Sequence, residues 1–173
     1  EKFPVVEGNF SVRERRGIGV VPPQDPNAQD VSVLIGSEDI SKLDKYSEDD
    51  PRVISLSGAF NVGNRGIVEF VEIFKNEIEF IHPAITATQE KLVPAPGRHP
   101  MVYHDLFIIS HCNEAEWSKF RSNNLKEAVM DRIYKIEVPY VLELDEEEKI
   151  YKKRLGESDF DSHIAPHTLK IAS

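Results

Sequence analysis

The chain has 173 residues, 40% of them hydrophobic and 29% charged, which is enough for one domain with a buried core. Its formal net charge of -9 argues against general nucleic-acid binding, because neutralising phosphates requires a surplus of lysine and arginine. A single cysteine excludes an internal disulfide. The sequence has no signal peptide, and no apolar run approaches the roughly 20 residues of a membrane span. It therefore predicts a soluble, cytoplasmic protein without membrane contact.

The first sixty residues are predicted to form short elements separated by turns and loops. In chain order these are an edge strand over residues 3–12, a charged turn over 13–16, a loop over 22–29, and helices over 30–35, 40–46 and 52–60. The loop contains three prolines and an Asp-Pro-Asn run, which favour turns and extended backbone. Asp30 is expected to cap the first helix, because its carboxylate can accept hydrogen bonds from free backbone N–H groups.

Residues 58–75 join a glycine-punctuated turn to an apolar run that carries carboxylates. Burying an ionised carboxylate is unfavourable unless it is paired, hydrogen-bonded or next to a metal, so Glu69 and Glu72 need an explanation. One interpretation is a half-exposed helix with both acids in solvent at i, i+3 spacing. The other is a core strand over residues 66–71 that delivers Glu72 to a nucleotide site at its carboxyl end.

The middle of the chain is predicted to contain a helix, a loop and a second strand. Apolar residues over 77–90 have near-helical spacing but are interrupted by Pro83, which predicts a broken helix. The proline-rich residues 93–100 separate two extended pieces and predict a projecting hairpin or loop. Residues 106–110 form a short apolar run typical of a parallel strand, and polar residues including Asn113 follow it directly.

The last part of the chain is predicted to be mostly helical. Residues 128–133 end a helix-like stretch, and residues 134–139 are interpreted as a strand closed by a proline. Residues 144–155 begin with acids and end with bases, which complements a helix dipole, and Gly156 is expected to cap that helix. Along the chain, the candidate site residues come in the order Glu72, Asn113 and Arg132, which are an acid, an amide and a guanidinium.

This order resembles the second half of an AAA+ ATPase core, where a Walker B strand, a sensor-1 strand and an arginine finger follow one another. Four stretches, residues 23–36, 87–90, 111–117 and 163–169, look like the bacterial PrkA proteins, which are named serine protein kinases. Residues 58–75 are also similar to minichromosome maintenance helicases. The resemblance covers nearly the whole chain. It implies an α/β AAA+ core, a P-loop NTPase-like parallel sheet flanked by helices, over residues 1–140, and the start of a truncated helical lid over 141–173.

The resemblance also implies roles toward ATP for three side chains. Glu72 would polarise the attacking water, and Asn113 would contact the terminal phosphate as sensor 1. Arg132 would act as the arginine finger at a neighbouring subunit's nucleotide, which implies a homo-oligomer. From the residues alone, Asn113 also fits a helix cap, and Arg132 fits an ion pair with Asp131 or a nearby glutamate.

The magnesium site departs from the family pattern. Val71 stands where most relatives have the aspartate that orders Mg2+, and valine cannot bind a metal. Either Glu69 substitutes from two residues back on the same strand face, or the metal is held elsewhere, or this member hydrolyses poorly. By analogy with helicase-like insertions, residues 92–103 are a candidate partner-contacting element, with an ordinary surface loop as the alternative.

A phosphate-binding loop ending in Gly-Lys-Ser or Gly-Lys-Thr occurs nowhere in these residues, so the chain alone cannot cradle phosphates. We therefore expect a piece of a longer protein, inactive alone, whose phosphate loop lies upstream. The motifs of eukaryotic-type kinases are also absent. The leading hypothesis is the hydrolytic half of a PrkA-like ATPase, named a serine protein kinase, that acts on a protein substrate. The alternatives are an ATP-driven remodelling or proteolytic machine, and a nucleotide-independent regulatory or scaffold module.

Overall fold

The computed structural model describes residues 8–25, 28–97, 99–122, 127–158 and 162–172. The chain divides into two compact units, Glu1–Ile133 and Tyr134–Ser173. The strands are β1 (Ile18–Val21), β2 (Ser37–Glu38), β3 (Ile54–Ser55), β4 (Ile67–Phe70), β5 (Leu92–Val93), β6 (Val102–Tyr103) and β7 (Phe107–Ser110). The α-helices are α1 (Ser32–Ile35), α2 (Ala59–Val62), α3 (Ile78–Glu90), α4 (Glu114–Arg121), α5 (Glu127–Met130), α6 (Leu144–Gly156) and α7 (Thr168–Ala172). Short 3-10 turns are η1 (Ile40–Lys42), η2 (Pro51–Val53) and η3 (Ile73–Lys75).

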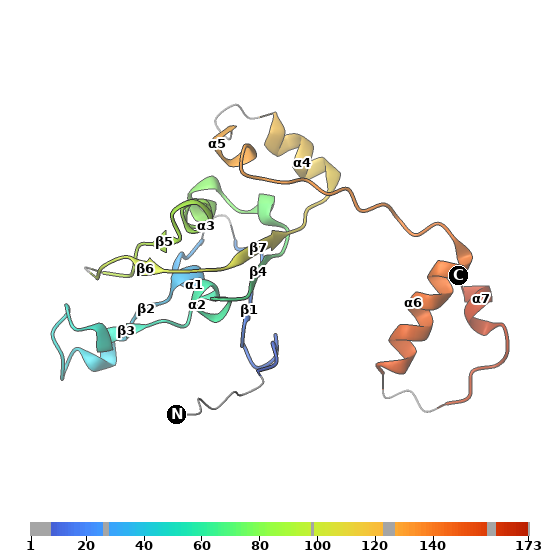
Figure 1. Cartoon of the computed structure of the whole chain (residues 1–173), viewed down its shortest axis with the longest axis horizontal. Helices are drawn as coiled ribbons and strands as arrows, with labels where there is room; N and C mark the ends of the chain where they lie inside the picture. Colours follow the sequence, from blue (N-terminus) through green and yellow to red (C-terminus); the bar gives the residue numbers. More distant parts are fainter. Residues whose placement is uncertain (1–7, 26–27, 98, 123–126, 159–161, 173) are drawn as a thin grey trace, which may run out of the picture. The chain divides into compact units, whose positions relative to one another are not determined.

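A parallel sheet with the order β1-β4-β7 forms the centre of the first unit, as Figure 1 shows. Val68 of β4 pairs with Gly19 of β1 on one side and with Ile108 of β7 on the other. The strand interpretation of residues 66–71 is confirmed, and the half-exposed helix is wrong. The strand over residues 106–110 is also confirmed. Because all the strands run the same way, their carboxyl ends meet at one edge of the sheet.

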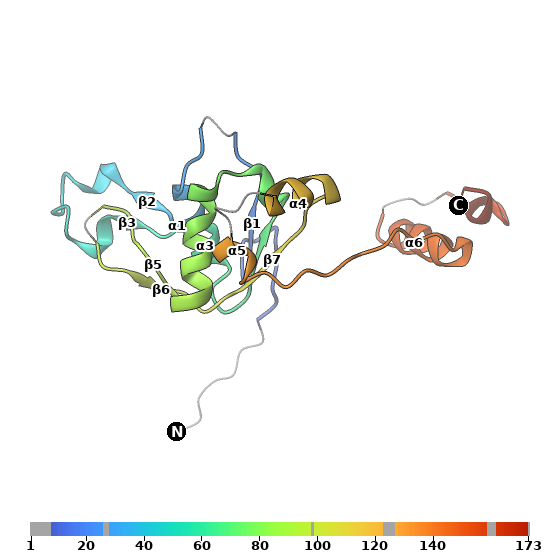
Figure 2. The same ribbon diagram turned by 90° about the horizontal axis from the view of Figure 1, so that it is seen from above.

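Helices cover one face of this sheet. The fully buried Val68 and Phe70 of β4 belong to a core cluster that α1, α2 and α3 complete, and Figure 2 shows α3 beside the strands. The alternate residues point the other way, and Phe107 on that face is 65% exposed. Glu69 lies on the same face, with its side chain 40% exposed. Its carboxylate therefore stays in contact with solvent.

Helix α3 is continuous, so the predicted break at Pro83 is wrong. Pro83 is the sixth of the thirteen residues of α3, so it removes a backbone donor from the helix interior. The buried residues of α3 lie on one helical face and hold the helix against the core; they are Phe80, Ile81, Ala84 and Ala87. Tertiary packing outweighs the local cost of the proline.

The predicted helix over residues 52–60 is also wrong. Asp50 accepts a hydrogen bond from the backbone N–H of Arg52, and Pro51 begins only a single 3-10 turn, η2. The chain then extends as β3, which pairs antiparallel with β2. Helix α2 begins after Gly58, where an added Cβ would lie 2.4 Å from backbone atoms of Leu34. Close approach of α1 to this segment therefore requires glycine and ends the extended stretch.

The other predicted N-terminal elements are partly found. Residues 3–7 of the predicted edge strand lie outside the described residues, while Ser11 and Arg16 form an isolated bridge across the charged turn. Asp30 accepts hydrogen bonds from the N–H and hydroxyl of Ser32, although the N-cap position itself is Val31. The helix predicted over residues 40–46 is the 3-10 turn η1.

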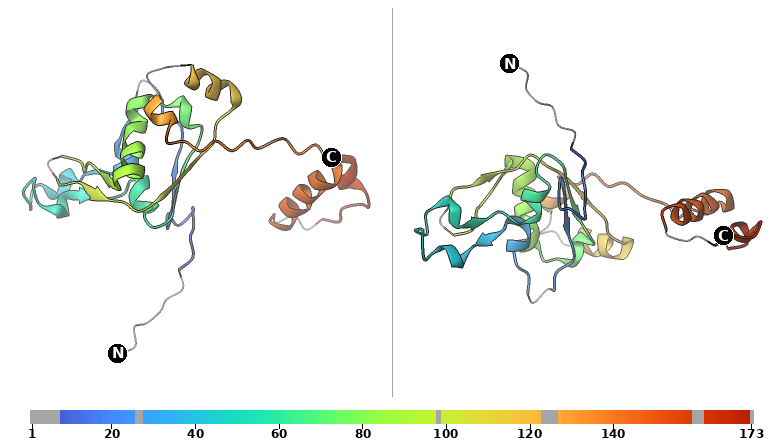
Figure 3. Two further views of the ribbon diagram at one scale, coloured as in Figure 1. Left: turned by 45° about the horizontal axis from the view of Figure 1, so that its top comes forward. Right: turned by 90° about the horizontal axis from the view of Figure 1, so that it is seen from below.

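The predicted hairpin is confirmed, because β5 and β6 pair antiparallel around the proline-rich residues. It lies beside the β2–β3 ribbon in both views of Figure 3. The two meet closely at Gly97, where an added Cβ would overlap the carboxylate of Glu38. Gly97 has a φ of +66°, a left-handed conformation that glycine adopts without strain.

The second unit contains α6 and α7, which pack against each other. Helix α6 is confirmed as predicted, except that Gly156 is its last residue and Glu157 its C-cap. The strand predicted over residues 134–139 is wrong, because these residues have no regular structure and pair with no strand in the described part of the chain. Tyr134, Ile136 and Val138 are exposed. In the described ranges, no helix combines the length and the apolar character that crossing a bilayer requires.

A fully buried histidine joins the segment between β6 and β7 to α2. The Nε2 of His104 lies 3.0 Å from Oδ1 of Asn61, whose amide donates to the carbonyl of Ile35. Because Asn61 uses its nitrogen as a donor, we assign the proton of His104 to Nε2. Burial lowers the pKa of His104, since the charged form loses its hydration.

We expect the protein to lose stability when the pH falls below about 6.5, the ordinary histidine pKa. His104 binds its second proton more weakly when folded than when unfolded, so acid favours the unfolded state in this window. Thermal unfolding from pH 7.5 to pH 5.5 tests this, with His104→Gln expected to flatten the pH dependence and exposed His82→Gln expected to leave it unchanged. Equal pH dependence in all three proteins would contradict the prediction.

Candidate functional site at the carboxyl edge of the sheet

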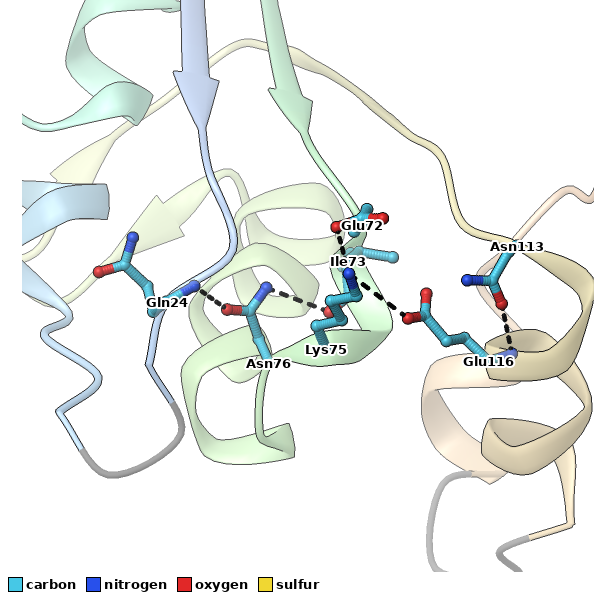
Figure 4. A network of polar contacts seen from close by, with 7 residues as sticks. All are labelled: Gln24, Glu72, Ile73, Lys75, Asn76, Asn113 and Glu116. Atoms are coloured by element: carbon cyan, nitrogen blue, oxygen red, sulfur yellow. Dashed lines mark hydrogen bonds and ion pairs between the residues drawn. The ribbon is translucent and has the colours of Figure 1, made fainter.

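The segments that leave β1, β4 and β7 come together at the carboxyl edge of the sheet (Figure 4). Gln24 follows β1, Glu72 follows β4, and Asn113 follows β7. Ile73 N donates to the carbonyl of His111 at 3.3 Å, so the segments after β4 and β7 are hydrogen-bonded to each other. The structure therefore places Glu72 and Asn113 at the same edge, each after one of two neighbouring strands.

Glu72 has a left-handed backbone conformation, with φ 49° and ψ 54°. This conformation is uncommon for a residue other than glycine, and the chain also adopts it at Arg15, Arg65, Lys91 and His167. It turns the chain sharply out of β4 and into η3. The Oε2 of Glu72 accepts a hydrogen bond from Nζ of Lys75 at 2.6 Å. The acid is thus paired and partly exposed, which answers how it is tolerated here.

Asn113 is the N-cap of α4, as one interpretation of the sequence predicted. Its Oδ1 accepts a hydrogen bond from the N–H of Glu116 at 2.8 Å. An amide oxygen has two lone pairs, and the Nδ2 group is not used by the cap. The capping role therefore leaves Asn113 able to donate a hydrogen bond to a ligand at the end of β7.

Sequence analysis gave no role to four residues that connect this site, Lys75, Glu116, Asn76 and Gln24. Lys75 lies between Glu72 and Glu116, with its Nζ 4.0 Å from Oε1 of Glu116 (Figure 4). Asn76 is only 4% exposed, and its side chain accepts from Gln24 N and donates to the carbonyl of Ile73. The i, i+3 spacing of Glu72 and Lys75 was the one available signal, and the other contacts join segments far apart in sequence.

Aromatic packing holds η3 against α4. The ring of Phe74 lies 5.7 Å from that of Trp117 and 4.1 Å from that of Phe120, measured between centroids. Trp117 and Phe120 of α4 therefore pack within the protein. The turn that carries Lys75 and the helix that carries Glu116 are therefore fixed relative to each other.

Glu69 lies on the uncovered face of the sheet, upstream of the turn that carries Glu72. Its Oε1 is 3.8 Å from Nε2 of His111. The described residues contain no group of three or more His, Cys, Asp or Glu side chains arranged to bind a metal. Mg2+ commonly needs only one or two carboxylates together with waters and phosphates, so a role for Glu69 in binding it stays a prediction.

Arg132 lies apart from Glu72 and Asn113. Its guanidinium donates to Oε1 of Gln89 at 2.7 and 3.1 Å. Gln89 is near the end of α3, roughly 16 Å along the helix from Ile78 at 1.5 Å per residue. Its role as an arginine finger stays a prediction.

A hollow of about 370 Å³ lies between α1, β2 and the loop of the hairpin. Glu38 is the charged residue of its lining, which contains none of the predicted site residues. The residues that line the hollow therefore do not connect it to the site at the carboxyl edge of the sheet.

The side chains at the carboxyl edge fit one part of a nucleotide site. A carboxylate and an amide donor suit a water molecule and a terminal phosphate oxygen. The edge itself is where open parallel sheets bind ligands. The backbone N–H cradle for the other phosphates has no counterpart in this sequence.

Comparison with known proteins assigns the family. All of residues 1–173 match the family model described as the PrkA AAA domain. The chain is 45% identical over 166 residues to the ATP-dependent protease PrkA of Bacillus subtilis (strain 168), covering 95% of this chain and 26% of that protein. It is 42% identical over 173 residues to the serine/threonine kinase YeaG of Escherichia coli (strain K12), covering 99% of this chain and 27% of that protein.

The chain therefore spans about a quarter of the length of these relatives. Among solved structures, NtrX from Brucella abortus in complex with ADP is similar, with a TM-score of 0.59 and 14% identity, covering 91% of this chain and 34% of that one. At this identity the likeness shows the fold alone, and it confirms the predicted α/β class with a parallel sheet flanked by helices. The chain belongs to the PrkA AAA domain family.

Proposed function

We propose that this chain supplies the hydrolytic half of an ATP-binding and ATP-hydrolysing module in a longer PrkA-type protein. The observation that carries the proposal is that Glu72 and Asn113 both lie at the carboxyl edge of the sheet, after the neighbouring strands β4 and β7. Further support comes from the ADP in a structure of similar fold. The phosphate loop would come from another part of the longer protein.

In this proposal, Glu72 accepts the proton of a water molecule whose oxygen bonds to the terminal phosphorus of ATP. The bond from that phosphorus to the oxygen of ADP breaks in the same displacement. Asn113 donates from Nδ2 to a terminal phosphate oxygen and so holds the phosphate in line with the water. Mg2+, when bound, supplies positive charge to the phosphate oxygens, and Glu69 is the residue we propose to help hold it.

The activity that uses this hydrolysis is a second question. One relative is named an ATP-dependent protease and another a serine/threonine kinase. Both names fit a protein substrate and consumption of ATP, so we propose the hydrolytic step that they share. Any residues for kinase chemistry would lie in other parts of the longer protein. If Arg132 acts on the nucleotide of a neighbouring copy, the protein is a homo-oligomer. We also propose that it is cytoplasmic and that residues 141–173 begin a helical lid.

The substitution Asn113→Asp tests the proposal, because it separates capping from catalysis. Aspartate caps helices as well as asparagine does, so α4 should remain intact. The amide donor is lost and a negative charge faces the phosphate, which should lower ATP turnover by roughly 10- to 100-fold, as expected for a lost hydrogen bond to a charged group.

Phosphate release by the full-length protein measures this effect, with thermal unfolding to confirm that the fold is kept. The matched control is Asn64→Asp. Asn64 also accepts a backbone N–H, that of Asp105, but lies before β4. Wild-type turnover in Asn113→Asp would contradict the proposal, as would an equal loss in both variants.

A further inference from the structure

Lys75 is placed between two carboxylates that differ in their surroundings. Its Nζ lies 2.6 Å from Oε2 of Glu72 and 4.0 Å from Oε1 of Glu116, as the close view in Figure 4 shows. The hydrogen bond from Lys75 to Glu72 raises the pKa of Lys75 above its ordinary value, so the ammonium stays charged at neutral pH. The nearer acid is the proposed water-polarising residue, while Glu116 has no part in the proposed function.

Glu116 is unusual for a glutamate on an external helix. Its side chain is only 19% exposed, and its Oε2 is buried without a hydrogen-bond partner among the described residues. A carboxylate that has lost much of its hydration is stabilised by a cation beside it, and Lys75 is that cation. Glu116 therefore attracts the ammonium of Lys75 toward α4.

The backbone around Lys75 is fixed on both sides. Asn76 ties the end of η3 to Gln24 after β1, through hydrogen bonds of 3.0 Å to Gln24 N and 3.2 Å to the carbonyl of Ile73. Phe74 packs on the aromatic side chains of α4. Lys75 thus begins from a rigid turn, and the positions of its two carboxylates decide where its ammonium lies.

We propose that Lys75 and Glu116 are positioning residues that fix the side chain of Glu72 for catalysis. Glu116 draws the ammonium toward α4, and the ammonium holds Oε2 of Glu72. The other oxygen, Oε1, is then the one that takes the proton of the attacking water. This inference rests on the proposed function of Glu72. It assigns a task to two residues that neither touch the phosphate nor accept the proton.

Three variants of the full-length protein test the inference: Lys75→Met, Lys75→Arg and Glu116→Gln. Lys75→Met should lower kcat for ATP hydrolysis by roughly 10- to 100-fold, the range that misplacing a reacting group costs, with KM for ATP unchanged. Lys75→Arg keeps the positive charge and should restore most of the rate. Glu116→Gln weakens the attraction without removing Lys75, and we expect a loss of about threefold.

The control is Lys91→Met, which breaks an exposed ion pair of similar length with Asp105 elsewhere in the same unit. It should leave kcat unchanged, and thermal unfolding should be similar for both methionine variants. A kcat in Lys75→Met equal to or above that of the wild type would overturn the inference, because the ammonium would then be idle or inhibitory.

A double-variant cycle with Glu72→Gln separates this inference from the proposed function. If Lys75 acts through Glu72, adding Lys75→Met to Glu72→Gln should cause no further loss. An additive loss would overturn the positioning role while leaving Glu72 in place. Full activity of Glu72→Gln alone would overturn both the proposed function and the inference that depends on it.

Discussion

Replacing Glu72 with glutamine in the full-length protein should lower ATP hydrolysis by about 10²- to 10⁴-fold, the usual contribution of a general base. Glutamine has the same shape and can still accept a hydrogen bond from Lys75, so the turn after β4 should keep its geometry. It cannot take a proton from water. ATP should therefore still bind, and phosphate release together with a direct binding measurement would show the two effects separately.

Glu69→Gln is the matched control for this prediction, since it makes the same change on the same stretch of chain. Glu69 lies on the uncovered sheet face near His111 instead of at the turn. If it helps to hold Mg2+, the variant should need more Mg2+ and recover turnover when Mg2+ is raised. Wild-type hydrolysis by Glu72→Gln, or an unrecoverable loss in Glu69→Gln as large as that in Glu72→Gln, would remove Glu72 from its proposed role.

The placement of Glu72 and Asn113 at one edge of the sheet was predictable because both follow short apolar strands. Parallel strands place their carboxyl ends at one edge, so two polar residues that each end such a strand come together. The sequence pattern alone left a helix open as an alternative for residues 66–71. The pairing of β4 with both β1 and β7 decides for the strand.

The supporting contacts were not predictable, because they join segments that are distant in the sequence. The hydrogen bond between Asn76 and Gln24 spans 52 positions, and no periodicity announces it. Lys75 and Glu116 come within 4.0 Å of each other where Phe74 packs on α4. Such contacts depend on tertiary packing, which local patterns do not encode.

The wrong predictions have the same origin in packing. Pro83 was read as a break, but the buried face of α3 keeps the helix continuous. The alternation around Ile136 was read as a strand, but a strand needs a hydrogen-bonded neighbour, and the described residues supply none. Strand β1 was missed because it is only four residues long and includes Gly19, which lacks β propensity but admits the close approach of α2.

Phe70→Ala should destabilise the first unit by about 3–5 kcal/mol, the usual cost of removing a buried phenylalanine side chain. Phe70 is fully buried on β4 and packs against Phe60, with their ring centroids 6.3 Å apart. Few neighbours can fill the space, because the β4 backbone is held by hydrogen bonds on both sides. Since domains are stable by only about 5–15 kcal/mol, the variant should be near the limit of folding.

Urea unfolding of the 173-residue chain measures this loss, with the fluorescence of Trp117, its single tryptophan, as the signal. Phe70→Leu keeps most of the volume and should cost less than about 1.5 kcal/mol. Phe107→Ala removes the same side chain from the exposed face of the neighbouring strand and should cost within about 0.5 kcal/mol. Equal losses in Phe70→Ala and Phe107→Ala would mean that both faces of the sheet are covered alike.

Phe70 is two residues before Glu72. A full-length Phe70→Ala protein that still folds should therefore also lose ATP turnover, because the carboxylate of Glu72 would be displaced.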